Sequence, residues 1–111
     1  MNNLINILNT FKSSFFTLVS EFGTDYIGNF YISFNDIKNM SERQRITKEL
    51  VQQYIDYIEF NGFTVKESSI GLELTTTARQ IATNPNDTLK LAAAIETFRT
   101  RAALNGDYPN M

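Results

Sequence analysis

The chain has 111 residues, of which 42% are hydrophobic and 13% aromatic, and its formal net charge is −2. This length and composition predict one globular domain, residues 1–111, that buries a hydrophobic core without the help of disulfide bonds. The chain contains no Cys and no His, which excludes a thiolate nucleophile, a Cys-based metal site and a Ser-His-Asp triad. The slightly negative charge argues against a protein that coats nucleic acid through charge alone.

The first predicted helix lies within "NNLINILNTFKSSFFTLVSEFG", where apolar residues recur at steps of three and four. They are Leu4, Ile7, Leu8, Phe11, Phe15, Leu18, Val19 and Phe22. This stripe is wide, so we expect the helix to pack on the domain and on something else, either more core or a dimer partner. The N-terminus does not resemble a secretory signal and no apolar run reaches membrane-span length, so we expect a cytoplasmic protein.

The segment "GNFYISF", residues 28–34, predicts a strand because Phe30, Ile32 and Phe34 alternate with polar or amphipathic residues. Ser33 precedes Asp36 by three residues, which is the spacing of a capping box. A short helix over "FNDIKNM" would then turn Ile37 toward the core.

Ser41 is predicted to cap the next helix, "SERQRITKELVQQYIDYIEF", with Gln44 at the capping-box position and Asn61-Gly62 at the end. Its buried stripe comprises Ile46, Leu50, Val51, Tyr54, Ile55 and Ile58. The opposite face carries Arg43, Arg45, Lys48, Glu49, Gln52, Gln53 and Asp56. The segment "MSERQR" can also continue a helix, so the sequence leaves open whether residues 33–60 form one helix or two.

A β-hairpin is predicted next, because Phe63 and Val65, and later Leu72 and Leu74, alternate with polar residues. Residues 68–71 supply the turn, in which Gly71 could take a positive φ. Thr76 or Thr77 could cap a short helix, and residues 84–87 form a break. The last predicted helix covers residues 87–105, with an apolar face made of Leu91, Ile95, Phe98 and Ala102.

This order of elements resembles a winged-helix domain over residues 4–82, with an added C-terminal helix. The segments that carry the resemblance are "ISFNDI", then Val51, Ile55 and Ile58 before "NGF", and finally "LELTTTARQIA". The resemblance implies an α+β, helix-rich single domain with a small antiparallel sheet. Without the short helix, the same pattern predicts a three-stranded antiparallel sheet with helices on one face.

Two functions compete, and for both we expect no enzyme activity, no cofactor and no metal site. An enzyme is a third, less favoured alternative, in which Asp36, Glu42, Glu49 and Asp56 could include a metal or acid–base pair. The first is a small binding protein with an accessory, regulatory or assembly role, acting mainly through protein partners. Its composition is similar to that of phage proteins. Interface anchors would be aromatic, and the candidates are Tyr26, Tyr31, Tyr54, Tyr57 and Phe98. A homodimer through the first and last helices is expected, because the last helix is rich in Ala and the first has a wide stripe.

The alternative function, implied by the winged-helix resemblance, is a dimeric DNA-binding transcriptional regulator. Cations would bind phosphates, and amide or guanidinium groups would read base edges. The candidate DNA contacts are Arg43, Arg45, Lys48, Gln52, Gln53 and Lys66. The competing interpretation is that these residues form the solvated face of an amphipathic helix, since Glu42, Glu49 and Asp56 are interleaved with them.

Overall fold

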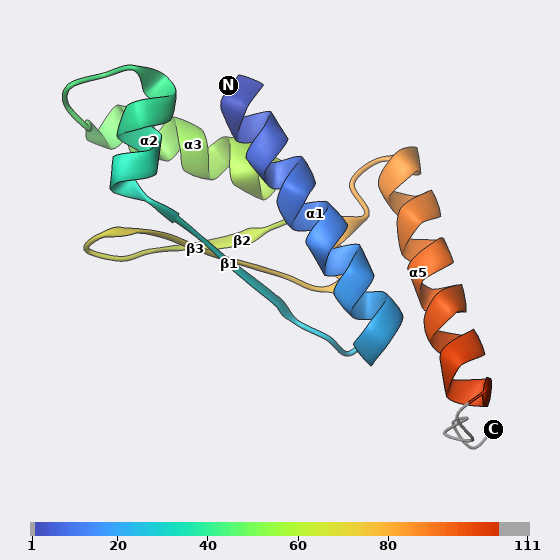
Figure 1. Ribbon diagram of the computed structural model, residues 1–111. Helices are drawn as coiled ribbons and strands as arrows, with labels where there is room; N and C mark the ends of the chain where they lie inside the picture. The colour runs from blue at the N-terminus through green and yellow to red at the C-terminus, as the bar shows by residue number, and fades with distance from the viewer. Residues whose placement is uncertain (1, 105–111) are drawn as a thin grey trace.

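The computed structural model describes residues 2–104, which form a helix-rich α+β domain with one small sheet (Figure 1). The predicted fold class is confirmed. In chain order the elements are α1 Asn2–Phe22, β1 Gly28–Ser33, α2 Phe34–Ser41, α3 Lys48–Phe60, β2 Thr64–Glu67, β3 Gly71–Thr76, α4 Ala78–Ile81 and α5 Pro85–Leu104. None of the helices within this part of the chain is long and apolar enough to cross a membrane.

The sheet has three antiparallel strands in the order β1-β3-β2. Ile32 of β1 pairs with Leu72 of β3, and Val65 of β2 pairs with Leu74. Ile32, Leu72 and Leu74 point into the core and are at most 1% exposed. Their neighbours along each strand point outward, as the two-residue period of a strand requires. One face of the sheet is therefore core and the other faces solvent.

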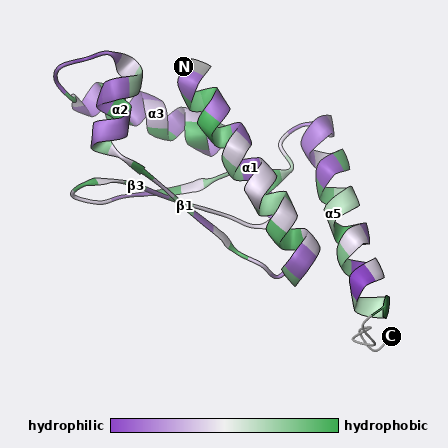
Figure 2. Cartoon of the chain, in the orientation of Figure 1, coloured by the Kyte–Doolittle hydropathy of each residue, from purple (hydrophilic) through white to green (hydrophobic). Residues whose placement is uncertain are grey.

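Helix α1 packs on the sheet with one side and on α5 with another, and Figure 1 shows α1 and α5 side by side. Leu8, Phe15 and Val19 join the core, and all three are at most 1% exposed. Most of the wide apolar stripe is thus covered within one chain, because α5 takes the side that the sheet does not, while Phe22 at its end is 60% exposed. Figure 2 shows the mixture of hydrophobic and hydrophilic residues along both helices.

The predicted start of the short helix α2 is confirmed. The Ser33 hydroxyl accepts a hydrogen bond from the Asp36 backbone N–H at 3.0 Å, and the Asp36 carboxylate accepts one from the Ser33 N–H at 3.2 Å. Two N–H groups that a helix start leaves unpaired are satisfied in this way. The box orients α2 so that Ile37 is completely buried.

The predicted start of the long helix is wrong, and residues 33–60 form two helices. Helix α2 ends at Ser41, and Glu42 adopts the left-handed conformation with φ 57°. The N–H of Glu42 and that of Arg43 donate to carbonyls of the last turn of α2, which closes that helix. Helix α3 begins only at Lys48, where the Thr47 hydroxyl accepts a hydrogen bond from the Leu50 N–H at 3.1 Å. Ser41 and Gln44 therefore do not form a capping box.

The hairpin is present, but the role predicted for Gly71 is wrong. Among the described glycines, Gly23 and Gly62 have a positive φ, whereas Gly71 lies in strand β3. Glycine is needed at position 71 because a Cβ there would lie 2.5 Å from the carbonyl oxygen of Ile32. The turn is instead fixed by Ser68, whose N–H and hydroxyl both donate to the Gly71 carbonyl.

Helix α4 follows Thr77, as predicted, although the Thr77 side chain makes no capping hydrogen bond. Helix α5 begins at Pro85, earlier than predicted, because the Asn84 side chain accepts a hydrogen bond from the Asp87 N–H at 2.9 Å. Pro at the first helical position is favourable, since it has no N–H to leave unpaired. The predicted end at residue 105 lies outside the described residues.

A buried ion pair joins α1 to the first turn of α5. The Lys12 ammonium donates to the Asp87 carboxylate at 2.9 Å, and the two residues are only 4% and 6% exposed. The Thr83 hydroxyl donates to the same carboxylate oxygen at 2.8 Å. Burial works to raise the pKa of Asp87, but these hydrogen bonds and the charge of Lys12 outweigh it and hold the pKa below its usual value. The Asp87 carboxyl is therefore ionised at neutral pH.

Candidate functional site

The most distinct polar surface is the outward side of α3 together with the turn that precedes it. We call this surface the α3 face; it comprises Glu42, Arg43, Arg45, Lys48, Glu49, Gln52, Gln53 and Asp56, all of them exposed. Its position is set by the other side of α3, where Leu50, Val51, Tyr54 and Ile58 are buried. Five of the six predicted DNA-contact residues lie on this one surface.

Positive charges gather toward the N-terminal end of α3, but acidic residues lie among them. Residues 41–53 carry three positive and two negative side chains. Farther along the helix, the Gln52 amide donates to the Asp56 carboxylate at 2.7 Å. Burial raises the pKa of Tyr54, and the positive charge of Arg43 opposes part of that rise.

A hollow of about 320 Å³ lies beside the α3 face, where α2, the start of α3 and the end of β2 meet. Phe34, Ile46 and Val51 are the apolar residues of its wall, and Lys48 and Glu67 bring opposite charges to it. Local sequence patterns do not predict this hollow. Phe34 belongs to α2, Ile46 to the turn and Glu67 to a strand, so only the tertiary fold brings them together.

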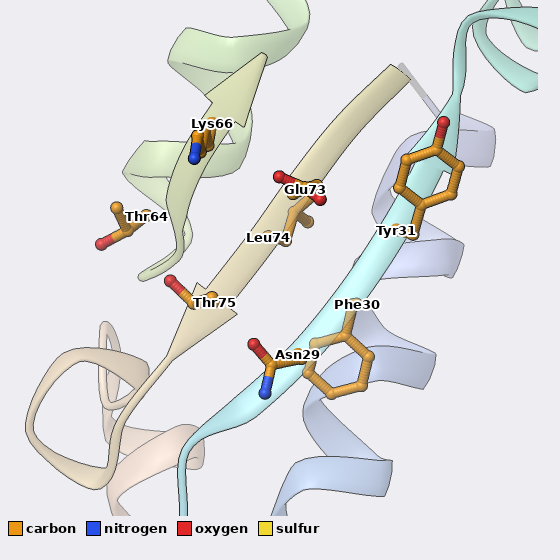
Figure 3. A pocket seen from close by; sticks show the side chains of 8 residues that line it. All are labelled: Asn29, Phe30, Tyr31, Thr64, Lys66, Glu73, Leu74 and Thr75. Atoms are coloured by element: carbon orange, nitrogen blue, oxygen red, sulfur yellow. The ribbon is translucent and has the colours of Figure 1, made fainter. Parts of the chain in front are cut away.

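The sixth predicted DNA contact, Lys66, lies on a different surface. Figure 3 shows Tyr31, Glu73 and Lys66 in one row across the solvent face of the sheet, with Asn29, Thr75 and Thr64 in a second row. These two rows border an open groove of about 540 Å³. Lys66 is directly opposite Glu73 in the strand register, so this face offers no excess of positive charge.

The predicted aromatic anchors do not form one interface. Tyr54 is 4% exposed and belongs to the core, so it is not available to a partner. Tyr26, Tyr57 and Phe98 are half-buried, and the Phe98 ring lies against Gly23 between α1 and α5. Only Tyr31, at 43% exposure, is open to solvent.

Other apolar side chains are more exposed than the predicted anchors. They are Phe22, Ile27, Phe60, Ile70, Leu89 and Leu104, which are between 55% and 82% exposed. Periodicity places Phe22 in the stripe of α1 but does not single out the others, since Phe60, Ile70 and Leu104 each lie at the end of an element or in a turn. They are distributed over several elements.

Within residues 2–104, the acidic residues do not gather into a metal-binding group. Across residues 2–104, no cluster of three or more metal-ligating side chains occurs. Asp36 is engaged in the cap of α2, and Asp87 is engaged with Lys12 and Thr83. The chemistry that the α3 face offers is hydrogen bonding and charge.

Comparison with known proteins does not assign this chain to a family. No protein-family model, no curated protein and no solved structure matches the chain significantly.

Proposed function

We propose that this chain is a non-enzymatic binding domain of the winged-helix type that binds duplex DNA through its α3 face. The observation that carries the proposal is the interruption between α2 and α3. It makes α3 a separate helix, anchored by the core on one side and exposed on the other. The hairpin that follows α3 and the strand order β1-β3-β2 agree with the winged-helix resemblance, which is an analogy at the level of the fold.

The side chains of the α3 face match the groups that duplex DNA requires. Arg43, Arg45 and Lys48 would bind phosphates at the N-terminal end of α3. Gln53 would read a base edge, since a Gln amide pairs with the two polar atoms of adenine in the major groove. Gln52 could do the same only after exchanging its hydrogen bond to Asp56.

The expected complex is weak and sensitive to salt. Three cations on the face correspond to about three phosphate contacts, and the slope of log K against log salt concentration would be about −3. Because Glu42 and Glu49 repel the backbone, we expect dissociation constants no tighter than about 1 μM at physiological salt.

Fluorescence anisotropy with a labelled duplex of mixed sequence, titrated at several salt concentrations, tests the proposal. Arg45→Glu is expected to weaken binding at least about tenfold and to reduce the salt slope by about 1. Arg79→Glu is the matched control. Arg79 is exposed on α4. Helix α4 lies near the C-terminal end of α3, opposite the end that carries the cations. Gly62 follows α3 and lies so close to Gln80 of α4 that a Cβ on Gly62 would meet the Gln80 carbonyl. Absence of binding by the unmodified chain at low salt, or equal losses in both variants, would contradict the proposal.

The hollow beside α3 favours a second candidate function, the binding of a protein partner. Its apolar wall could receive an apolar side chain, and Lys48 and Glu67 could pair with charges around that side chain. The near balance of charge on the α3 face is also compatible with such a partner. Ile46→Lys would place a charge in the hollow. A partner retained by the unmodified chain and by Arg79→Glu, but lost with Ile46→Lys, would support this function.

A further inference from the structure

The side of α5 that points away from α1 carries a stripe of exposed residues. Packing within the described part of the chain does not cover its leucines. Ala94 and Ala102 are buried on the side that faces α1. On the opposite side, Leu89 is 69% exposed and Leu104 is 82% exposed. Helical spacing places Ala93, Glu96 and Thr100 between these two leucines on the same side, and all three are exposed.

This stripe is complementary to itself when two copies run antiparallel. The midpoint between Leu89 and Leu104 falls between Glu96 and Thr97. A two-fold axis at that point would place Leu89 of one copy opposite Leu104 of the other, and Ala93 opposite Thr100. The middle of the stripe has small side chains, so two helices could approach closely there and still bring the leucines into contact.

The charges along α5 favour the antiparallel orientation. In that register, Glu96 of each copy lies within two residues of the level of Arg99 of the other, on the same flank of the helix pair. A parallel pair would instead set Glu96 against Glu96 and place Arg99 near Arg101 of the other copy. On the other flank of the antiparallel pair, Lys90 faces Arg101, a like-charged contact that exposed side chains can relieve by turning toward water.

We propose that α5 forms a symmetric homodimer with α5 of a second copy, antiparallel and centred between Glu96 and Thr97. The proposal is independent of DNA binding. A helix of 20 residues is about 30 Å long, so the contact is small and we expect a dissociation constant of about 1–100 μM. Helix α1 takes no part, because most of its apolar stripe is already covered by the sheet and by α5.

Sedimentation equilibrium of the full chain, at concentrations spanning the micromolar range, tests this dimer. The unmodified chain is expected to dimerise, and Leu89→Arg to raise the dissociation constant at least about tenfold. Ile70→Arg is the matched control, because Ile70 is equally exposed, at 69%, but lies in the hairpin turn. Ile70→Arg should leave the dissociation constant of the dimer unchanged. Circular dichroism of each variant verifies that it is folded.

Charge variants test the register as well as the surface. Glu96→Arg should weaken the dimer, and Glu96→Arg combined with Arg99→Glu should restore it, because the pair is exchanged between copies. Lys90→Glu should tighten the dimer by giving Arg101 of the other copy an opposite charge. A monomer at every concentration, or a dimer indifferent to Leu89→Arg, would overturn the proposal. A dimer that Leu89→Arg weakens but the double charge exchange fails to restore would overturn the antiparallel register.

Discussion

Replacing Lys12 by Met should destabilise the fold more than most single substitutions. Met has nearly the volume of Lys but no charge, so the change removes the partner of Asp87 and leaves the packing in place. The Asp87 carboxylate is buried, and its remaining side-chain partner is the Thr83 hydroxyl. Breaking a buried ion pair from one side costs about 3–5 kcal/mol. We expect the lower end, about 3 kcal/mol, because Thr83 and the N-terminal dipole of α5 still support the charge.

Urea unfolding followed by circular dichroism measures this loss. A destabilisation of about 3 kcal/mol would lower the melting temperature by about 10–20 °C for a domain of this size. The double variant Lys12→Met with Asp87→Leu is the informative control. It removes both charges, so it should recover a large part of the stability, since a buried pair exchanged for apolar residues is often nearly neutral.

The pH dependence provides an independent readout of the same pair. The pKa of Asp87 is lower in the folded chain than its unfolded value, so the pair stabilises the fold at neutral pH. That stabilisation is lost as the pH falls below about 4 and through the folded pKa. In Lys12→Met, burial without a cation should raise the pKa of Asp87, and the difference from the unmodified chain should shrink in acid. A Lys12→Met variant within 1 kcal/mol of the unmodified chain, or a constant difference at all pH values, would refute this reasoning.

The remaining stability predictions concern a helix cap and a glycine, and chemical denaturation measures each of them. Thr47→Ala should cost about 1 kcal/mol because it removes the cap of α3, whereas Ser41→Ala should cost less than half of that, since Ser41 caps no helix. Equal costs would contradict the placement of the α3 start. Gly71→Ala should cost about 2 kcal/mol or more, because its Cβ would lie 2.5 Å from the Ile32 carbonyl oxygen, which cannot move without breaking the sheet. A neutral Gly71→Ala variant would contradict the tight approach of β1 and β3.

Local chemistry in the sequence predicted much of this fold. The capping box of Ser33 and Asp36 was correct because both partners lie within four residues of each other. The predicted start of α3 is wrong because Ser41 and Thr47 are both residue types that cap a helix. The choice is made by Glu42, whose left-handed conformation ends α2. That conformation is uncommon for a residue with a side chain, so the sequence alone gives little sign of it.

Contacts between distant segments account for what the sequence could not provide. The stripe on α1 was visible, but its second partner, α5, was not, because helical periodicity says which side is apolar and not what covers it. The ion pair between Lys12 and Asp87 joins residues 75 positions apart. Likewise, the polar side of α3 was predicted residue by residue, whereas the hollow beside it depends on Phe34, Ile46 and Glu67 meeting in space.

The most direct test of the proposed function is to map where DNA touches the chain. Backbone amide shifts in a ¹⁵N NMR titration with a short duplex would report the contact surface residue by residue. We predict the largest shifts at Arg43, Arg45, Lys48 and Gln53 on the α3 face, diminishing as salt is added. Shifts confined to the solvent face of the sheet or to α5, or the absence of shifts at low salt, would contradict the assignment of the α3 face to DNA.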